Sequence, residues 1–127
     1  LTSNYHYSGV FIDSSYMYFT TASNSTQSAV LKFNKSTGAL VGLKGLLNTT
    51  PAGGDTGCTS LSSGSIVSDG LWCLGSNSSG FFNASNLIPV NRGRVLGAFD
   101  NPSAITGDTN YFYILDSNNG RIQRLKK

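Results

Sequence analysis

The stretch that decides the fold is residues 102–125, which read Pro-Ser-Ala-Ile-Thr-Gly-Asp-Thr-Asn-Tyr-Phe-Tyr-Ile-Leu-Asp-Ser-Asn-Asn-Gly-Arg-Ile-Gln-Arg-Leu. It holds a short apolar segment, a Gly-Asp turn, an aromatic segment, a Ser-Asn-Asn-Gly turn and a third segment. Apolar and polar residues alternate in the second and third segments, which is the pattern of half-buried strands. Because turn residues separate all three segments, the stretch predicts an antiparallel meander.

Composition extends this prediction to the whole chain. Ser, Thr and Asn fill 42 of the 127 positions, and there is no Glu and only five Lys. Hydroxyl and amide residues suit strands and turns, whereas an exposed helix face needs Glu and Lys. We therefore predict an all-β fold, in a chain long enough for one domain with a modest core.

Parts of the decisive stretch recur earlier in the chain. Asp13-Ser-Ser-Tyr-Met-Tyr-Phe19 matches Asp108-Thr-Asn-Tyr-Phe-Tyr-Ile114, and Asp69-Gly-Leu-Trp-Cys-Leu74 is a shorter copy. Two further matches pair 38–42 with 93–97 and 30–33 with 122–125. Recurrence at nearly constant spacing indicates a repeat of four-stranded antiparallel meanders. We predict units over about 8–43, 64–99 and 103–127, the last without a fourth strand, and a separate strand over 1–7.

The decisive stretch resembles the NHL-type repeat of six-bladed β-propellers. Three segments carry the resemblance: Pro102-Ser-Ala-Ile, Tyr111-Phe-Tyr-Ile-Leu-Asp116 and Asn119-Gly-Arg-Ile122. The first unit, with Phe33-Asn-Lys-Ser-Thr-Gly-Ala-Leu40, resembles a generic blade of the quinoprotein or NHL superfamily. The resemblance implies an open array of nearly three β-propeller-like blades. It carries no activity, because such repeats serve lyases, lactonases, binding scaffolds and adhesins alike.

An open array of blades leaves sheet edges that pair with other chains. We expect strand 1–7 of one copy to complete the sheet after 121–125 of the next, giving a ring or a filament by strand complementation. The residues expected at this assembly edge are Tyr5, Tyr7, Arg121, Ile122, Arg124 and Leu125. Two alternatives stay open: a fragment of a longer propeller, or a small β-sandwich that is no propeller.

Cysteines and sequons indicate an extracellular, glycosylated chain. Cys58 and Cys73 are the only cysteines, and a disulfide between them would close a loop of about 16 residues for about 3 kcal/mol. Five sequons provide candidate N-glycosylation sites, at Asn24, Asn34, Asn48, Asn77 and Asn83. The chain starts without Met or an apolar leader, so we expect a processed or partial chain. No apolar run approaches the length of a membrane span.

No catalytic or metal signature accompanies these features, so we expect no enzyme activity and no cofactor. His6 is the only histidine and lacks a nucleophile elbow, so we interpret it as a strand-edge residue. The repeated aspartates, Asp13, Asp69 and Asp108, suit turn caps better than metal ligands or acid–base groups. Tyrosines at alternate strand positions, together with Trp72, suit packing between blades better than a sugar platform.

Charge gives only a weak indication of partners. The net charge is +3, and four of the nine cations lie in the last seven residues, at Arg121, Arg124, Lys126 and Lys127. A basic tail on a slightly acidic body does not predict a nucleic-acid binder. The expected partners are copies of the chain itself, with glycans or acidic polysaccharide as a second class. The expected function is a self-associating structural module; the alternative is a piece of a secreted propeller that binds carbohydrate or protein, or belongs to a lyase-type enzyme.

Overall fold

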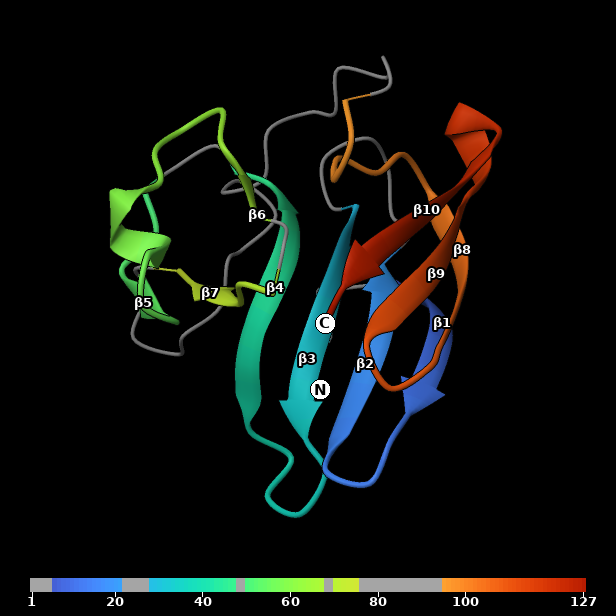
Figure 1. The fold of residues 1–127 in the computed structure, drawn as a ribbon, viewed down its shortest axis with the longest axis horizontal. Coiled ribbons are helices and arrows are strands. Elements are labelled where there is room, and N and C mark those ends of the chain that lie inside the picture. The colour runs from blue at the N-terminus through green and yellow to red at the C-terminus, as the bar shows by residue number, and fades with distance from the viewer. Residues whose placement is uncertain (1–5, 22–27, 48–49, 68–69, 76–94) are drawn as a thin grey trace.

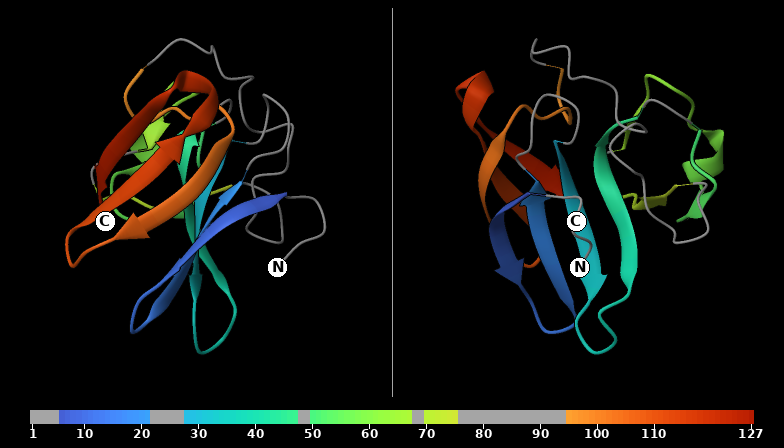
Figure 2. Two further views of the ribbon diagram at one scale, coloured as in Figure 1. Left: turned by 90° about the vertical axis from the view of Figure 1, so that its right-hand side faces the viewer. Right: turned by 180° about the vertical axis from the view of Figure 1, so that it is seen from behind.

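The computed structural model describes residues 6–21, 28–47, 50–67, 70–75 and 95–127. These residues form two antiparallel sheets, as Figure 1 shows, which confirms the all-β prediction. The two sheets pack against each other at one hydrophobic cluster, and β8 of the second sheet lies alongside β1 of the first, running in the same direction, as the left view of Figure 2 shows.

The first sheet is built on a four-stranded meander of consecutive strands. These are β1 (Tyr7–Ile12), β2 (Tyr16–Thr21), β3 (Ala29–Asn34) and β4 (Leu40–Leu46), and each pairs antiparallel with the next. The turn between β3 and β4 ends at Gly38 with φ of 71°, a conformation that costs a glycine little. The meander begins and ends within about three residues of the unit predicted over about 8–43.

The second sheet contains the decisive stretch of the sequence. Its strands are β8 (Pro102–Gly107), β9 (Tyr111–Asp116) and β10 (Arg121–Lys126), in the order β10-β9-β8. A short 3-10 turn, η3 (Ser117–Asn119), joins β9 to β10, and Gly120 follows it in the left-handed conformation. The three predicted strands and both predicted turns are confirmed.

The middle of the chain differs from its prediction as a meander of its own. Three two-residue strands, β5 (Gly53–Gly54), β6 (Ile66–Val67) and β7 (Cys73–Leu74), extend the first sheet beyond β4. The 3-10 helix η1 (Cys58–Ser60) lies between β5 and β6. Gly42 permits this pairing, because a Cβ there would lie 2.9 Å from the backbone carbon of Trp72.

The unit predicted over about 64–99 requires a last strand near its end, and this is wrong for residues 95–99, which form a turn and extended chain. Side chains from β10 bind the main chain here in place of a neighbouring strand. The amide of Gln123 accepts from Gly97 N and donates to Ala98 O, at 2.8 and 2.6 Å. Arg121 donates to Val95 O and Ala98 O. Because these bonds satisfy the local main chain, no strand pairing is required.

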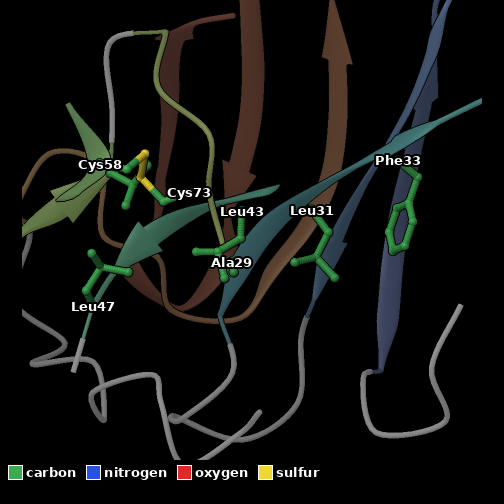
Figure 3. Packing of buried hydrophobic residues seen from close by; sticks show 8 residues of the cluster. Ala29, Leu31, Phe33, Leu43, Leu47, Cys58 and Cys73 are labelled. Carbon is green, nitrogen blue, oxygen red and sulfur yellow. A yellow bond between two sulfur atoms is a disulfide. The ribbon is translucent and has the colours of Figure 1, made fainter. Parts of the chain in front are cut away.

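Each face of the first sheet covers one hydrophobic cluster. One cluster, drawn in Figure 3, joins β3 and β4 to the 47–73 segment and contains Ala29, Leu31, Phe33, Leu43, Leu47, Cys58, Val67 and Cys73. The other lies between the two sheets and contains Tyr18, Val30, Trp72, Phe99, Ile105, Phe112, Ile114 and Leu125. The predicted disulfide is present, with Cys58 and Cys73 bonded at 2.05 Å.

Candidate functional site: the exposed face and free edge of the C-terminal sheet

The turns that precede β2 and β9 have the same hydrogen bonds. Asp13 Oδ1 accepts from the backbone N–H groups of Ser15 and Tyr16 at 2.9 and 2.8 Å, and Tyr18 donates its hydroxyl to Oδ2 at 3.0 Å. Asp108 does the same with Asn110 and Tyr111 at 2.8 and 2.9 Å, and with the Tyr113 hydroxyl at 3.0 Å. Both aspartates are therefore turn caps, as predicted; Asp69 lies outside the described residues.

These bonds set the charge of the two carboxylates. Burial opposes ionisation of Asp13, but the N–H groups, the Tyr18 hydroxyl and Lys127 together lower its pKa below the ordinary value. Two backbone N–H groups lower the pKa of the exposed Asp108 carboxyl in the same direction. Both groups are therefore anionic at neutral pH.

The equivalence of the two units extends from these turns into the third strand of each. Lys35 N donates to Ser15 O at 2.9 Å, and Lys127 N donates to Asn110 O at 2.9 Å. Cross-strand neighbours correspond as well: Phe11, Tyr18 and Lys32 lie side by side, as do Thr106, Tyr113 and Arg124. A residue of β1 or β2 thus has its counterpart 95 positions later, and a residue of β3 has one 92 positions later.

This correspondence defines two kinds of face. We call the face of a unit that accepts another sheet its receiving face; in the first unit it carries Gly9, Phe11, Tyr18, Val30 and Lys32. We call the opposite face the docking face; in β8–β10 it carries Ile105, Phe112, Ile114 and Leu125. Within the chain, the docking face of β8–β10 packs on the receiving face of β1–β3.

Aromatic contacts and one glycine hold this internal interface together. The rings of Tyr18 and Phe112 meet edge to face at 4.6 Å, and those of Phe11 and Phe112 at 6.2 Å. Gly9 lets β8 approach β1 closely, because a Cβ there would lie 3.0 Å from Ala104 Cα. At one end, Lys127 Nζ lies 3.5 Å from Asp13 Oδ2 of the first unit and 4.5 Å from the Phe11 ring centre.

The receiving face of β8–β10 is exposed and partly apolar. It carries Ala104, Thr106, Tyr113, Leu115, Ile122 and Arg124. Ile122 is 70% exposed and Leu115 43% exposed, although both are large aliphatic side chains. All of these residues except Arg124 surround a shallow apolar hollow of about 240 Å³, which Ile105 also lines. An apolar surface of this kind marks a site of interaction.

The outer edge of β10 adds main-chain groups to this surface. Because Lys127 N bonds to Asn110 O, alternation in an antiparallel ladder directs residues 121, 123 and 125 toward β9. The N–H and C=O groups of Ile122, Arg124 and Lys126 then point away from the sheet. Among the described strands, β10 pairs with β9 alone.

The structure separates the residues predicted for the assembly edge. Ile122 and Arg124 are exposed on the receiving face, but Leu125 is a core residue that is 7% exposed. Arg121 Nε bonds to the buried Asp116 carboxylate at 2.9 Å, within a network that Gln123 and Asn119 join. Tyr7 begins β1 and pairs with Thr21 of its own sheet, so the predicted separate strand cannot include it. Tyr5 lies outside the described residues.

The other candidate residues lie apart from this surface. Tyr18 and Trp72 are both 2% exposed, so they pack between layers and cannot stack on a sugar. His6 is exposed just before β1. Asn34 lies at the β3–β4 turn, where its side-chain oxygen accepts from Ser36 and Thr37. The remaining sequons, at Asn24, Asn48, Asn77 and Asn83, are outside the described residues.

Two further properties of the described residues bear on the site. They contain no group of three or more His, Cys, Asp or Glu side chains that could hold a metal ion. None of their helices is long and apolar enough to cross a membrane. Comparison of the chain with protein-family models, curated proteins and solved structures found no match.

Sequence reasoning found the strands of this surface but missed the surface itself. The repeat alignment already contained the signal, since it pairs Tyr18 with Tyr113 and Val30 with Ile122. It did not show that Tyr18 and Val30 are buried, whereas their counterparts Tyr113 and Ile122 are exposed. That difference follows only from which sheet stacks on which.

Proposed function

We propose that this chain is an extracellular structural module that associates head to tail with copies of itself and has no catalytic activity. The observation that carries the proposal is the end of the second sheet, where an apolar face is exposed and where β10 has a partner on one side only among the described strands. Exposed edges of this kind take up further strands, and exposed apolar faces take up further layers.

Strand complementation is the proposed mode of association along the β10 edge. The outward N–H and C=O groups of Ile122, Arg124 and Lys126 are spaced to pair with an incoming strand. The segment proposed to supply it is residues 1–5, which precede β1 in a second copy. If successive copies close by rotation they form a ring, and otherwise a filament.

The test is association of the purified chain, followed by native mass spectrometry and electron microscopy over a concentration series. We expect rings or filaments for the unchanged chain. Arg124→Pro removes one outward N–H donor without touching the bonds to β9, so it should abolish association or weaken it at least about tenfold. Arg124→Ala is the matched control, because it removes the same side chain but keeps the N–H group. A chain that stays monomeric at every concentration contradicts the proposal.

The extracellular and glycosylated parts of the proposal draw support from the disulfide and the sequons. Disulfides form and persist in oxidising compartments, and Cys58 and Cys73 are bonded. Asn34 lies in a turn whose neighbours Lys35 and Ser36 are exposed. For chain isolated from its natural source, treatment with an N-glycosidase should lower the mass by one or more glycans. An unchanged mass would refute this part and leave self-association standing.

A second candidate is that the chain is a segment of a secreted propeller that binds carbohydrate or protein, or that belongs to a lyase-type enzyme. The exposed receiving face of β8–β10 favours it too, because the next unit of a longer chain would cover the same surface. The two candidates differ in one respect. A segment separated from its following unit remains monomeric or aggregates without order, whereas a self-associating module forms regular assemblies of one kind.

A further inference from the structure

We propose that the receiving face of β8–β10 binds the exposed edge of the docking face of a second copy, at β1, with Ile12 of that copy against Thr106 and Lys35 against Asp108. This inference rests on the proposed self-association and specifies its surface. It follows from the internal interface, which already shows how one unit of this chain stacks on another.

The first step is the equivalence of the two receiving faces. Phe11, Tyr18 and Lys32 of the first unit correspond to Thr106, Tyr113 and Arg124 of the second, in the same cross-strand register. Even the cation above an aromatic ring recurs: Lys32 Nζ lies 3.9 Å from the Tyr16 ring centre, and the Arg124 guanidinium lies 4.8 Å from that of Tyr111. In the first unit this face is covered by a sheet, and in the second it is open.

The second step is the surface that would cover it. Within the chain the close contact is made by β8, which lies over β1 and β2. The counterpart of β8 is β1, whose docking face carries Val10 and Ile12. Both side chains are about half exposed, at 53 and 51%. Farther across the same face, Leu31 and Phe33 of β3 are buried in the chain's own cluster. A second copy therefore contacts β8 and β9 through β1 alone, at the exposed edge of its docking face.

The third step is charge complementarity at one end of the interface. Lys127 follows β10 and reaches Asp13 of the first unit, with Nζ 3.5 Å from Oδ2. The counterpart of Lys127 is Lys35, and the counterpart of Asp13 is Asp108. Both counterparts are exposed. Stacking in the same geometry therefore places an ammonium of the second copy beside an anionic carboxylate of the first.

One difference between the units limits how closely the copies approach. The counterpart of Gly9 is Ala104, and at Gly9 a Cβ would meet β8 at 3.0 Å. The second copy must then lie farther out by roughly the thickness of a methyl group. Association between copies is accordingly weaker than the packing within one chain, which suits an assembly that forms reversibly with concentration.

Cross-linking between variants with one added cysteine, beside the bonded Cys58 and Cys73, tests the proposed contact. Within the chain, a Cβ on Gly107 would lie 3.2 Å from the Phe11 ring, and the counterparts of this pair are Ile12 and Thr106. We expect Ile12→Cys and Thr106→Cys chains, mixed and treated with a short bis-maleimide, to give a cross-linked dimer. Neither variant alone should do so above a tenth of that yield. Ser36→Cys, an exposed turn residue off this face, replaces Ile12→Cys in the control mixture.

Association constants test the charge pair independently. Lys35→Glu should weaken association by about two- to five-fold in the unchanged chain, the range of a surface ion pair, and much less in an Asp108→Asn background. Asn keeps the side-chain oxygen that caps the turn, so folding is retained and circular dichroism verifies it.

The outcomes distinguish this inference from the proposed function. Suppose that regular assemblies form, but the mixture of Ile12→Cys and Thr106→Cys chains cross-links no better than the Ser36→Cys control. Suppose also that Lys35→Glu weakens association equally in the unchanged chain and in the Asp108→Asn background. Copies then meet through another surface. The inference then fails and self-association stands. If every variant and the unchanged chain remain monomeric, both fail.

Discussion

At the residue scale, the molecule depends on short polar side chains that replace missing backbone partners. Asp13 and Asp108 each close a turn through two backbone N–H groups and one tyrosine hydroxyl. Asp116 accepts from Asp100 N, Asn119, Arg121 and Gln123 while fully buried. Each of the three carboxylates therefore accepts several hydrogen bonds that hold a turn or a nearby stretch of main chain in place.

The turn caps predict a dependence of stability on acid pH. The pKa values of Asp13 and Asp108 lie below the ordinary value of 3.8, so the unfolded chain binds more protons in this range. Their contribution is complete above pH 4 to 5 and is lost as the pH falls through the folded-state pKa values. Urea unfolding at a series of pH values should show this loss. The free energy of unfolding should fall less steeply with falling pH in the Asp13→Asn and Asp108→Asn variants than in the unchanged chain. An equal slope in the unchanged chain and the double variant would contradict the prediction.

At the element scale, close packing between sheets depends on positions without a side chain. Gly9 and Gly42 allow β8 and the Trp72 main chain, respectively, to approach the first sheet. Large aromatic residues fill the remaining space on either side, with Tyr18, Trp72 and Phe112 in mutual ring contact.

Gly9→Ala tests this packing. The new Cβ would lie 2.9 Å from Thr20 Oγ1 and 3.0 Å from Ala104 Cα, so one sheet must move. We expect a loss of about 1–3 kcal/mol in the free energy of unfolding, the usual cost of overpacking. Gly53→Ala is the control, because the nearest atom to its new Cβ is 3.9 Å away. Equal stability of the two variants in urea would show that the sheets adjust freely at Gly9.

The same scale shows how much of the fold was predictable from the sequence. Alternation and turn residues located β1–β4 and β8–β10, because each of these strands pairs with a neighbour in sequence. They failed at 95–99, where Arg121 and Gln123 bind the backbone from a distant strand. They indicated strands over 65–69 and 70–74, where β6 and β7 lie, but assigned these to a separate unit, because their actual partner β4 is 20 or more residues away. Local pattern reveals local pairing only.

At the scale of the whole molecule, the chain is a stack of layers with two unlike ends. Leu47, Cys58, Val67 and Cys73, the last of these bonded to Cys58, pack on the face of the first sheet that carries Leu31 and Phe33. The sheet β8–β10 packs on the opposite face, which carries Tyr18 and Val30. For the candidate site, the sequence predicted Ile122 and Arg124 but misplaced Tyr7 and Leu125. Leu125 was misplaced because a repeat pattern does not show which face of a strand is covered, and Tyr7 because β1 begins one residue before the unit predicted from residue 8.

The unlike ends give any stack of copies a direction. A copy added at one end presents a receiving face, and a copy added at the other presents a docking face, so the two ends grow by different reactions. A chain with one face blocked can still join through the other, and it then halts growth at that end. A small fraction of such chains would set the length of every assembly, as a monofunctional monomer does in step-growth polymerisation.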